Sequence, residues 1–248
     1  MSEPLRHGHQ DMRMPSIDGV LFDYGRTLVT FTYPTDELLR VLREFRPRIE
    51  AALAVRAPEA ETILRDVLLP MERYVDSTSE DEVDYSAVYG ASWERAGLKL
   101  PDELLHEILD AEQQCWDRAV RVDSSALSLL AWLRDQGIKR GVCSNAPFPP
   151  AMMRRQVRSN GLAVLVDAIV FSSEVGRRKP APEVYQAALA ALGTRPERTL
   201  FVGDRVREDY EGPRALGMRA VIVTAHADEN PPDGVAVIRS LAEVQPLV

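Results

Sequence analysis

The sequence predicts an α/β fold in two parts: a parallel β-sheet core with helices on both faces, and an all-helical cap inserted after the first strand. Two observations predict it. After residue 123, short apolar runs alternate with helical segments, which is typical of parallel strands joined by helices. Between residues 34 and 120, apolar residues instead recur at helical spacing, and no segment has the pattern of a strand.

The first predicted strand is the apolar run from Gly19 to Phe22, which leads into the carboxylate of Asp23. Further strands are expected at residues 138–143, 168–171, 199–202, 220–223 and 235–238. Helices are expected at residues 124–136, 149–160 and 182–192, followed by a helix ending near Gly217 and one capped by Ser240. Gly137 and Gly193 directly follow two of these helices, where glycine commonly terminates a helix.

The predicted cap has four helical segments, whose apolar positions span residues 38–49, 63–71, 85–93 and 104–116. Pro47 and Pro70 are expected to break or kink the helices that contain them. The two ends of an insert, here near Pro34 and Val122, are expected to lie close together, so the insert can close over the sheet edge as a lid. The predicted division is a flexible tail at 1–15, an α/β core at 16–32 and 122–248, and a helical cap at 33–121.

Composition argues against several classes of protein. The net charge of −8 and the absence of a long basic run do not suit a nucleic-acid-binding surface. No stretch approaches the roughly 18–20 apolar residues that span a bilayer, and the polar N-terminus is typical of a loose tail rather than a signal peptide. Cys115 and Cys143 are too few for a disulfide framework and fall in segments expected to be buried, so a reducing cytoplasm is predicted. The sequence makes no prediction about the oligomeric state.

Polar side chains follow four of the predicted strands, at the sheet edge where ligands bind in open α/β folds. They are Asp23 and Thr27 after the first strand, Ser144 and Asn145 after the second, Lys179 after the third, and Asp204 and Asp209 after the fourth. The sequence therefore predicts carboxylates, a hydroxyl group and an ammonium group at one edge of the sheet.

Four segments resemble, in order, the motifs of the haloacid dehalogenase-like (HAD) hydrolase superfamily, whose core is a Rossmann-like parallel sheet. They are residues 20–28, residues 142–145, residues 176–180, and residues 202–204 followed by Asp209, Gly212, Gly217 and Met218. Each segment alone is a weak signal, but four in the family's order, each at a strand end, make a strong one.

The resemblance implies a role for each residue. Asp23 would attack phosphorus and form an aspartyl-phosphate. Magnesium (Mg²⁺) would be bound by Asp23, by the backbone carbonyl of Gly25, and by Asp204, with Asp209 bound directly or through water.

The remaining matched residues would bind the phosphate of the substrate. Ser144, with Asn145 and backbone N–H groups of the loop, would hold the transferring phosphoryl oxygens. Lys179 would neutralise the nucleophile and the phosphate, and Thr27 would support the site. The expected partner is a small phosphorylated metabolite, with no nucleic acid and no membrane.

The resemblance fails at one position. Family phosphatases usually carry a second aspartate two residues after the nucleophile, which protonates the leaving alkoxide, and here this residue is Gly25. A general acid contributes about 10²–10⁴-fold to the rate. The next residue, Arg26, cannot replace the acid because it stays protonated, although it could bind a phosphate or another anion.

Three explanations of Gly25 stay open. The substrate has a good leaving group that departs without a proton; or a side chain from the cap region supplies the proton; or the protein is a weak catalyst that binds a phosphorylated ligand. The candidate side chains are Tyr24, Tyr33, Asp36, Glu37 and His106. Haloacid dehalogenases also lack the second aspartate, but they lose the acidic metal ligand that Asp204 supplies here, so the sequence favours phosphate hydrolysis.

Four arginines, Arg177, Arg178, Arg205 and Arg207, also fall in loops near the predicted site. A cationic rim that recruits anionic substrates is one interpretation. The sequence favours a solvated set of surface arginines.

Overall fold

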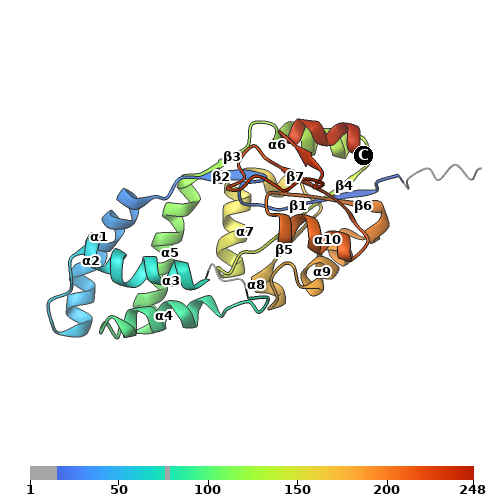
Figure 1. Cartoon of the computed structure of the whole chain (residues 1–248). Helices are drawn as coiled ribbons and strands as arrows, with labels where there is room; N and C mark the ends of the chain where they lie inside the picture. Colours follow the sequence, from blue (N-terminus) through green and yellow to red (C-terminus); the bar gives the residue numbers. More distant parts are fainter. Residues whose placement is uncertain (1–15, 76–78) are drawn as a thin grey trace, which may run out of the picture.

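The structure is a computed structural model and describes residues 16–75 and 79–248. The tail predicted at residues 1–15 lies outside the described residues. The core is a six-stranded sheet in which all neighbouring strands run parallel, as predicted (Figure 1). In spatial order the strands are β5 (Ala168–Phe171), β4 (Lys139–Ser144), β1 (Gly19–Phe22), β6 (Thr199–Gly203), β7 (Arg219–Val223) and β8 (Val237–Ile238).

The central strand β1 contributes to two hydrophobic cores, one on each face of the sheet. Val20 and Phe22 enter one core, and Leu21 enters the other, because successive side chains of a strand point to opposite faces. The first core is closed by α6 (Ala126–Asp135), α7 (Pro150–Ser159) and the 3₁₀ segment η5 (Leu241–Leu247), and the second by α9 (Pro182–Leu192). The predicted helices on both faces are therefore confirmed.

Shorter helical segments lie in the connections of the core. They are η2 (Leu162–Val164), α8 (Ser172–Val175), η3 (Pro196–Arg198), η4 (Val206–Glu211) and α10 (Gly212–Ala215). The C-terminal segment predicted as a helix capped by Ser240 is the 3₁₀ segment η5, and the Ser240 side chain makes no cap hydrogen bond.

The cap is helical, as predicted, and lies to one side of the sheet (Figure 1). Its elements are α1 (Thr35–Leu53), α2 (Ala60–Ile63), the π-helical turn η1 (Leu64–Leu68), α3 (Leu69–Val75), α4 (Tyr85–Arg95) and α5 (Asp102–Ala119). They enclose a hydrophobic core of their own, centred on the fully buried Trp93 and Tyr89. Pro47 lies inside α1 and does not break it, and Pro70 is the second residue of α3, just after the π-helical turn.

The cap joins the core through a two-stranded antiparallel ribbon, β2 (Val29–Phe31) with β3 (Val120–Val122). The sequence analysis expected no strand here, because three-residue strands are too short to show a period of two. The ribbon pairs Val29 with Val122, and the N–H of Asp123 donates to the carbonyl of Leu28 at 2.9 Å. The two ends of the insert therefore lie together.

A second connection ties the cap to the loop that precedes Lys179. The N–H of Arg178 donates to the carbonyl of Glu80 at 2.8 Å, and the N–H of Glu82 donates to the carbonyl of Gly176 at 3.1 Å. The side chain of Arg178 is buried, and the residue is only 5% exposed. Its guanidinium donates to the carbonyl of Val75 at 2.6 Å and lies 3.5 Å from the buried Glu82 carboxylate. The prediction of a solvated surface arginine was therefore wrong for Arg178. Its charge can be buried because these partners compensate it.

Both cysteines, Cys115 and Cys143, are buried and free, in α5 and β4. Burial raises the pKa of Cys143 to about 12. Within the described residues, no helix is both long and apolar enough to cross a membrane.

One carboxylate is fully enclosed by the cap. Glu112 of α5 is 5% exposed, and its Oε1 atom has no hydrogen-bond partner. Burial, together with the negative charge of Glu72, raises the pKa of Glu112 to about 8. The folded protein therefore keeps a proton on Glu112 at pH values where the unfolded chain releases it.

This predicts that Glu112 destabilises the fold as the pH rises from about 4.5 to about 8. We expect Glu112→Gln to match the wild type in free energy of unfolding near pH 4. Near pH 8 the variant should be more stable by about 2–4 kcal/mol, because glutamine has no proton to lose. Urea unfolding at both pH values measures the difference. A stability gap that does not change with pH would contradict the prediction.

Candidate active site

A pocket of about 540 Å³ lies between the carboxyl ends of the central strands and the cap. Strands β4, β1 and β6 are neighbours in the sheet, so Ser144, Asp23 and Asp204, at or just past their ends, all line the pocket. Neighbouring strands thus bring together residues that are far apart in the sequence, as expected for a ligand site of an open α/β sheet.

The ammonium group of Lys179 lies between two carboxylates at the base of the pocket. Its Nζ atom is 2.7 Å from Oδ1 of Asp23 and 2.6 Å from Oδ1 of Asp209. Burial alone disfavours the ammonium form, but the charges of Asp209 and Asp23 outweigh it and raise the pKa of Lys179 well above its ordinary value. Lys179 therefore stays charged and holds the carboxylate of Asp23 in place.

Asp209 also organises the loop after β6. Its Oδ2 atom accepts hydrogen bonds from the N–H of Asp204 at 3.1 Å and the N–H of Arg205 at 3.0 Å. A side chain at Gly203 would overlap the Asp209 carboxylate, so only glycine allows this close approach. Asp209 therefore fixes Asp204 through the backbone and Lys179 through its charge.

The buried cluster at the base of the pocket carries more negative than positive charge. Oxygen atoms from Asp23, Asp204 and Asp209 lie within 4.8 Å of one another. Burial, followed by the charges of Asp23 and Asp209, raises the pKa of Asp204 to about 7. Burial also raises the pKa of Asp209 to about 6, although the Lys179 charge opposes it. One ammonium cannot balance three carboxylates, and this oxygen-only set suits a hard divalent cation.

Asn145 positions Lys179 through the backbone. Its Nδ2 atom donates to the carbonyl of Lys179 at 3.1 Å, and its Oδ1 atom accepts from the N–H of Lys179 at 2.7 Å. The peptide bond between Lys179 and Pro180 is cis. Asn145 and Ser144 both line the pocket, so both lie where the sequence analysis placed them.

The loop after β1 brings the other predicted residues to the same place. Gly25 and Arg26 line the pocket. Arg26 has a positive φ of 58° and forms an ion pair with Asp228, so an incoming anion would compete with that carboxylate. Thr27 is 1% exposed, and its hydroxyl donates to Oδ1 of Asp204 at 3.4 Å, a contact that supports Asp204.

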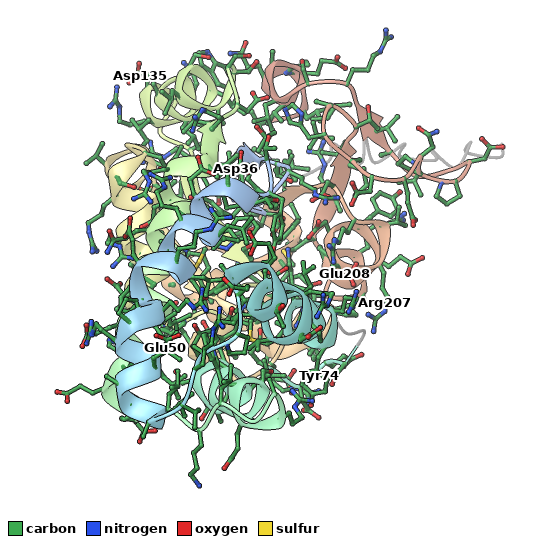
Figure 2. All side chains as sticks on the ribbon, turned by 90° about the vertical axis from the view of Figure 1, so that its left-hand side faces the viewer. Asp36, Glu50, Tyr74, Asp135, Arg207 and Glu208 are labelled. Atoms are coloured by element: carbon green, nitrogen blue, oxygen red, sulfur yellow. The ribbon has the colours of Figure 1, made fainter. Side chains whose placement is uncertain are left out.

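The five candidates for a replacement acid differ in whether they line the pocket. Tyr24 and Tyr33 line the pocket, whereas Asp36, Glu37 and His106 are not among the residues that line it. Asp36 lies on α1, on the side of the cap that faces the viewer in Figure 2. The hydroxyl of Tyr24 is buried and accepts a hydrogen bond from Asn160 at 2.7 Å. Burial raises the pKa of Tyr24 above its ordinary value.

Glu72 is a pocket residue that the sequence analysis missed. It lies on α3, and one of its oxygens accepts a hydrogen bond from the hydroxyl of Tyr33 at 3.0 Å. Among many glutamates on helical segments, spacing alone does not distinguish the one that faces a pocket. The only available signal was its position between the apolar residues Leu68 and Met71 and the apolar residue Val75.

A comparison with protein-family models agrees with this geometry. The model described as haloacid dehalogenase-like hydrolase matches residues 17–217. The chain belongs to the haloacid dehalogenase-like hydrolases. The matched range contains Asp23, Ser144, Lys179, Asp204 and Asp209, so the resemblance noted in the sequence is confirmed.

Several characterised HAD-like hydrolases are similar to this chain. The glyceraldehyde 3-phosphate phosphatase of Methanothermobacter thermautotrophicus is 27% identical over 217 residues, which is 86% of this chain and 88% of that protein. The phosphoserine phosphatase of Thermus thermophilus is 36% identical over 98 residues, which is 40% of this chain and only 39% of that protein.

Solved structures of HAD-like proteins share the fold. A HAD phosphatase from Thermococcus onnurineus has a TM-score of 0.65 at 20% identity, covering 93% of this chain and 97% of that one. A 2-haloacid dehalogenase from Pseudomonas syringae has a TM-score of 0.67 at 20% identity, again covering 93% and 97%. Phosphatases and dehalogenases share this fold, so the site must distinguish the two activities.

The contact between Gly203 and Asp209 predicts the effect of a single methyl group. We expect Gly203→Ala to lower the free energy of unfolding by about 1–3 kcal/mol, because the Asp209 side chain must move. Thermal unfolding measures the loss. The matched control is Gly90→Ala in α4, where the added carbon meets only a Leu105 methyl at 3.7 Å and should be tolerated. Equal melting temperatures for Gly203→Ala and wild type would contradict this account of Asp209.

Proposed function

We propose that this HAD-like hydrolase is a magnesium-dependent phosphatase that acts on a small phosphorylated metabolite through an aspartyl-phosphate on Asp23. The observation that carries the proposal is the buried cluster of Asp23, Lys179, Asp204 and Asp209 in one pocket. The phosphatase names of its relatives support it.

In the first step, a carboxylate oxygen of Asp23 forms a bond to phosphorus while the bond from phosphorus to the ester oxygen breaks. The ester oxygen leaves with the bonding electrons, and water then attacks the aspartyl-phosphate, releasing phosphate and restoring Asp23. Lys179 holds Asp23 at 2.7 Å and balances charge as it builds up on the phosphoryl oxygens. Ser144, at the end of β4, would hold one of those oxygens.

The residues for the metal are the carboxylates of Asp23 and Asp204 and the backbone carbonyl of Gly25. Asp209 already accepts three hydrogen bonds, from Lys179 and two backbone N–H groups, which favours contact through water. When bound, Mg²⁺ supplies positive charge that the three carboxylates and the incoming phosphate lack.

Asp204 and Asp209 also favour this reaction over halide displacement, which the sequence analysis ranked lower. A haloacid dehalogenase needs no metal, and a metal-free site would leave the three clustered carboxylates of Asp23, Asp204 and Asp209 around the ammonium group of Lys179. The two free, buried cysteines support a reducing, cytoplasmic environment.

The first test is release of p-nitrophenol from p-nitrophenyl phosphate, with magnesium or with EDTA. This aryl leaving group departs without a proton, so Gly25 does not hide the activity. We expect magnesium-dependent turnover in the wild type and at least a ~10³-fold lower kcat in Asp23→Asn, which lacks the nucleophile.

The matched control is Asp135→Asn, an exposed aspartate at the end of α6 (Figure 2), which should keep full activity. If the wild type released no p-nitrophenol in either condition, the proposal would be replaced by the alternative that the protein binds a phosphorylated ligand without hydrolysing it. Turnover of a haloacid without metal would replace it with a dehalogenase.

The second test restores the missing acid. A Cβ atom added at Gly25 would meet only the edge of the Phe31 ring at 3.6 Å, an ordinary contact, so the backbone there accepts a side chain. We expect Gly25→Asp to raise kcat for an alkyl phosphate, whose alkoxide needs a proton, by about 10²-fold or more. Gly25→Asn, of the same size, should give no such gain. An equal effect of both variants would show that the carboxyl group does not act as an acid.

A further inference from the structure

The pocket has two chemically different ends. At the sheet end lie Lys179 and the carboxylates described above, and at the cap end lie Tyr33, Glu72, Tyr85, Gln113 and Trp116. We propose that the cap end is a subsite for a leaving group that ends in a hydrogen-bond donor, an ammonium or hydroxyl group, on an apolar stem. This inference rests on the proposed phosphatase function and names its substrate class.

Gln113 supplies an unused acceptor. It lies on α5, is 2% exposed and lines the pocket. Its Nε2 atom donates to Asp117 at 3.4 Å, whereas its Oε1 atom is buried without a hydrogen-bond partner. A buried polar atom without a partner is destabilising, so a donor on a ligand that reaches this atom would relieve that penalty.

Glu72 supplies a second acceptor and a negative charge. Its carboxylate accepts one hydrogen bond, from the hydroxyl of Tyr33 at 3.0 Å. In the part of the chain that the structure describes, no lysine or arginine forms an ion pair with Glu72. Burial raises the pKa of Glu72, and the hydrogen bond from Tyr33 opposes that rise. An ammonium group on the ligand would supply the counter-charge that the protein does not.

Aromatic rings form part of the wall at the cap end. The ring of Trp116 meets Tyr33 edge-to-face at 5.1 Å and Phe31 at 5.8 Å, and Tyr85 packs on Phe148 at 4.8 Å. Because these rings pack on one another, they form a fixed apolar surface rather than a flexible one. Such a surface suits an apolar stem, and aromatic rings also attract a cationic head group.

The cationic side chains of the pocket would attract anionic groups of a ligand to the sheet end rather than to the cap end. Lys179 lies at the sheet end, in the loop before Pro180, whereas Arg26 is paired with Asp228 and Arg178 with Glu82. Arg73, the neighbour of Glu72 on α3, is an exposed cation that also lines the pocket. A ligand with a carboxylate head group would instead bind near Arg73. The test therefore includes an ester with a carboxylate group as the competing substrate class.

The test compares four para-substituted phenyl phosphates that carry an aminomethyl, hydroxymethyl, ethyl or carboxymethyl group. All four release a phenol, so none depends on the acid missing at Gly25. In the wild type with magnesium, we expect kcat/KM for the aminomethyl and hydroxymethyl esters to exceed that for the ethyl ester at least ~10-fold. The difference should lie in KM, because the head group binds far from the reacting atoms.

Two variants assign the acceptors. Glu72→Gln should remove most of the preference for the aminomethyl ester and keep that for the hydroxymethyl ester, while Gln113→Met should reduce both. The matched controls are the exposed Glu44→Gln on α1 and Gln114→Met on α5, which should leave all four ratios unchanged. Circular dichroism and thermal unfolding close to those of wild type report that each variant is folded, and near-wild-type turnover of p-nitrophenyl phosphate by the two controls reports that the chemistry is intact.

Equal kcat/KM for all four esters, a preference for the carboxymethyl ester, or unchanged ratios in Glu72→Gln and Gln113→Met would each overturn the subsite. Absence of p-nitrophenyl phosphate turnover in the wild type would instead overturn the proposed phosphatase. In that case calorimetric affinities of the same four esters, in wild type and variants, must show the same order, and equal affinities would overturn the subsite as well.

Discussion

The ammonium group of Lys179, buried between Asp23 and Asp209, is the interaction on which the rest of the site depends. A buried lysine is stable only with close counter-charges, and clustered carboxylates are stable only with a cation among them. Two other residues support this contact. Asn145 forms hydrogen bonds with both the N–H and the carbonyl of Lys179, and Gly203 leaves room for the Asp209 side chain. The sheet order that places β4, β1 and β6 side by side completes it.

The same lysine couples the site to the cap. Residues 80–82 of the cap form backbone hydrogen bonds with loop residues 176–178, immediately before Lys179. In addition, the side chains of Arg178 and Glu82 form a buried ion pair. The cap is therefore held at two places, the β2–β3 ribbon and this loop. The second contact therefore links the cap directly to the loop that carries Lys179.

Much of the core could be predicted from the sequence, because parallel strands buried on both faces are continuous apolar runs and the polar residues at their ends are few. Prediction failed where tertiary contacts decide. The strands β2 and β3 are three residues long and exist because the cap has to return to its starting point. Arg178 is buried because Glu82 and Val75, about a hundred residues earlier, surround it. Glu72 faces the pocket because of how α3 packs, which its neighbours in sequence do not reveal.

Gly25 and the cap end of the pocket bear on the same question, which is how this protein selects a leaving group. An active site with its own acid can expel almost any alkoxide, so its selectivity depends on binding alone. Without that acid, the proposed reaction would discriminate by the stability of the departing oxygen, and the proposed subsite would discriminate by what that oxygen is attached to. The aromatic rings and the acceptors of Glu72 and Gln113 line the same pocket as Asp23. On the proposed function, selectivity is divided between the absence of a carboxylate at residue 25 and two cap acceptors, the Oε1 atom of Gln113, which has no partner, and the carboxylate of Glu72, which has one.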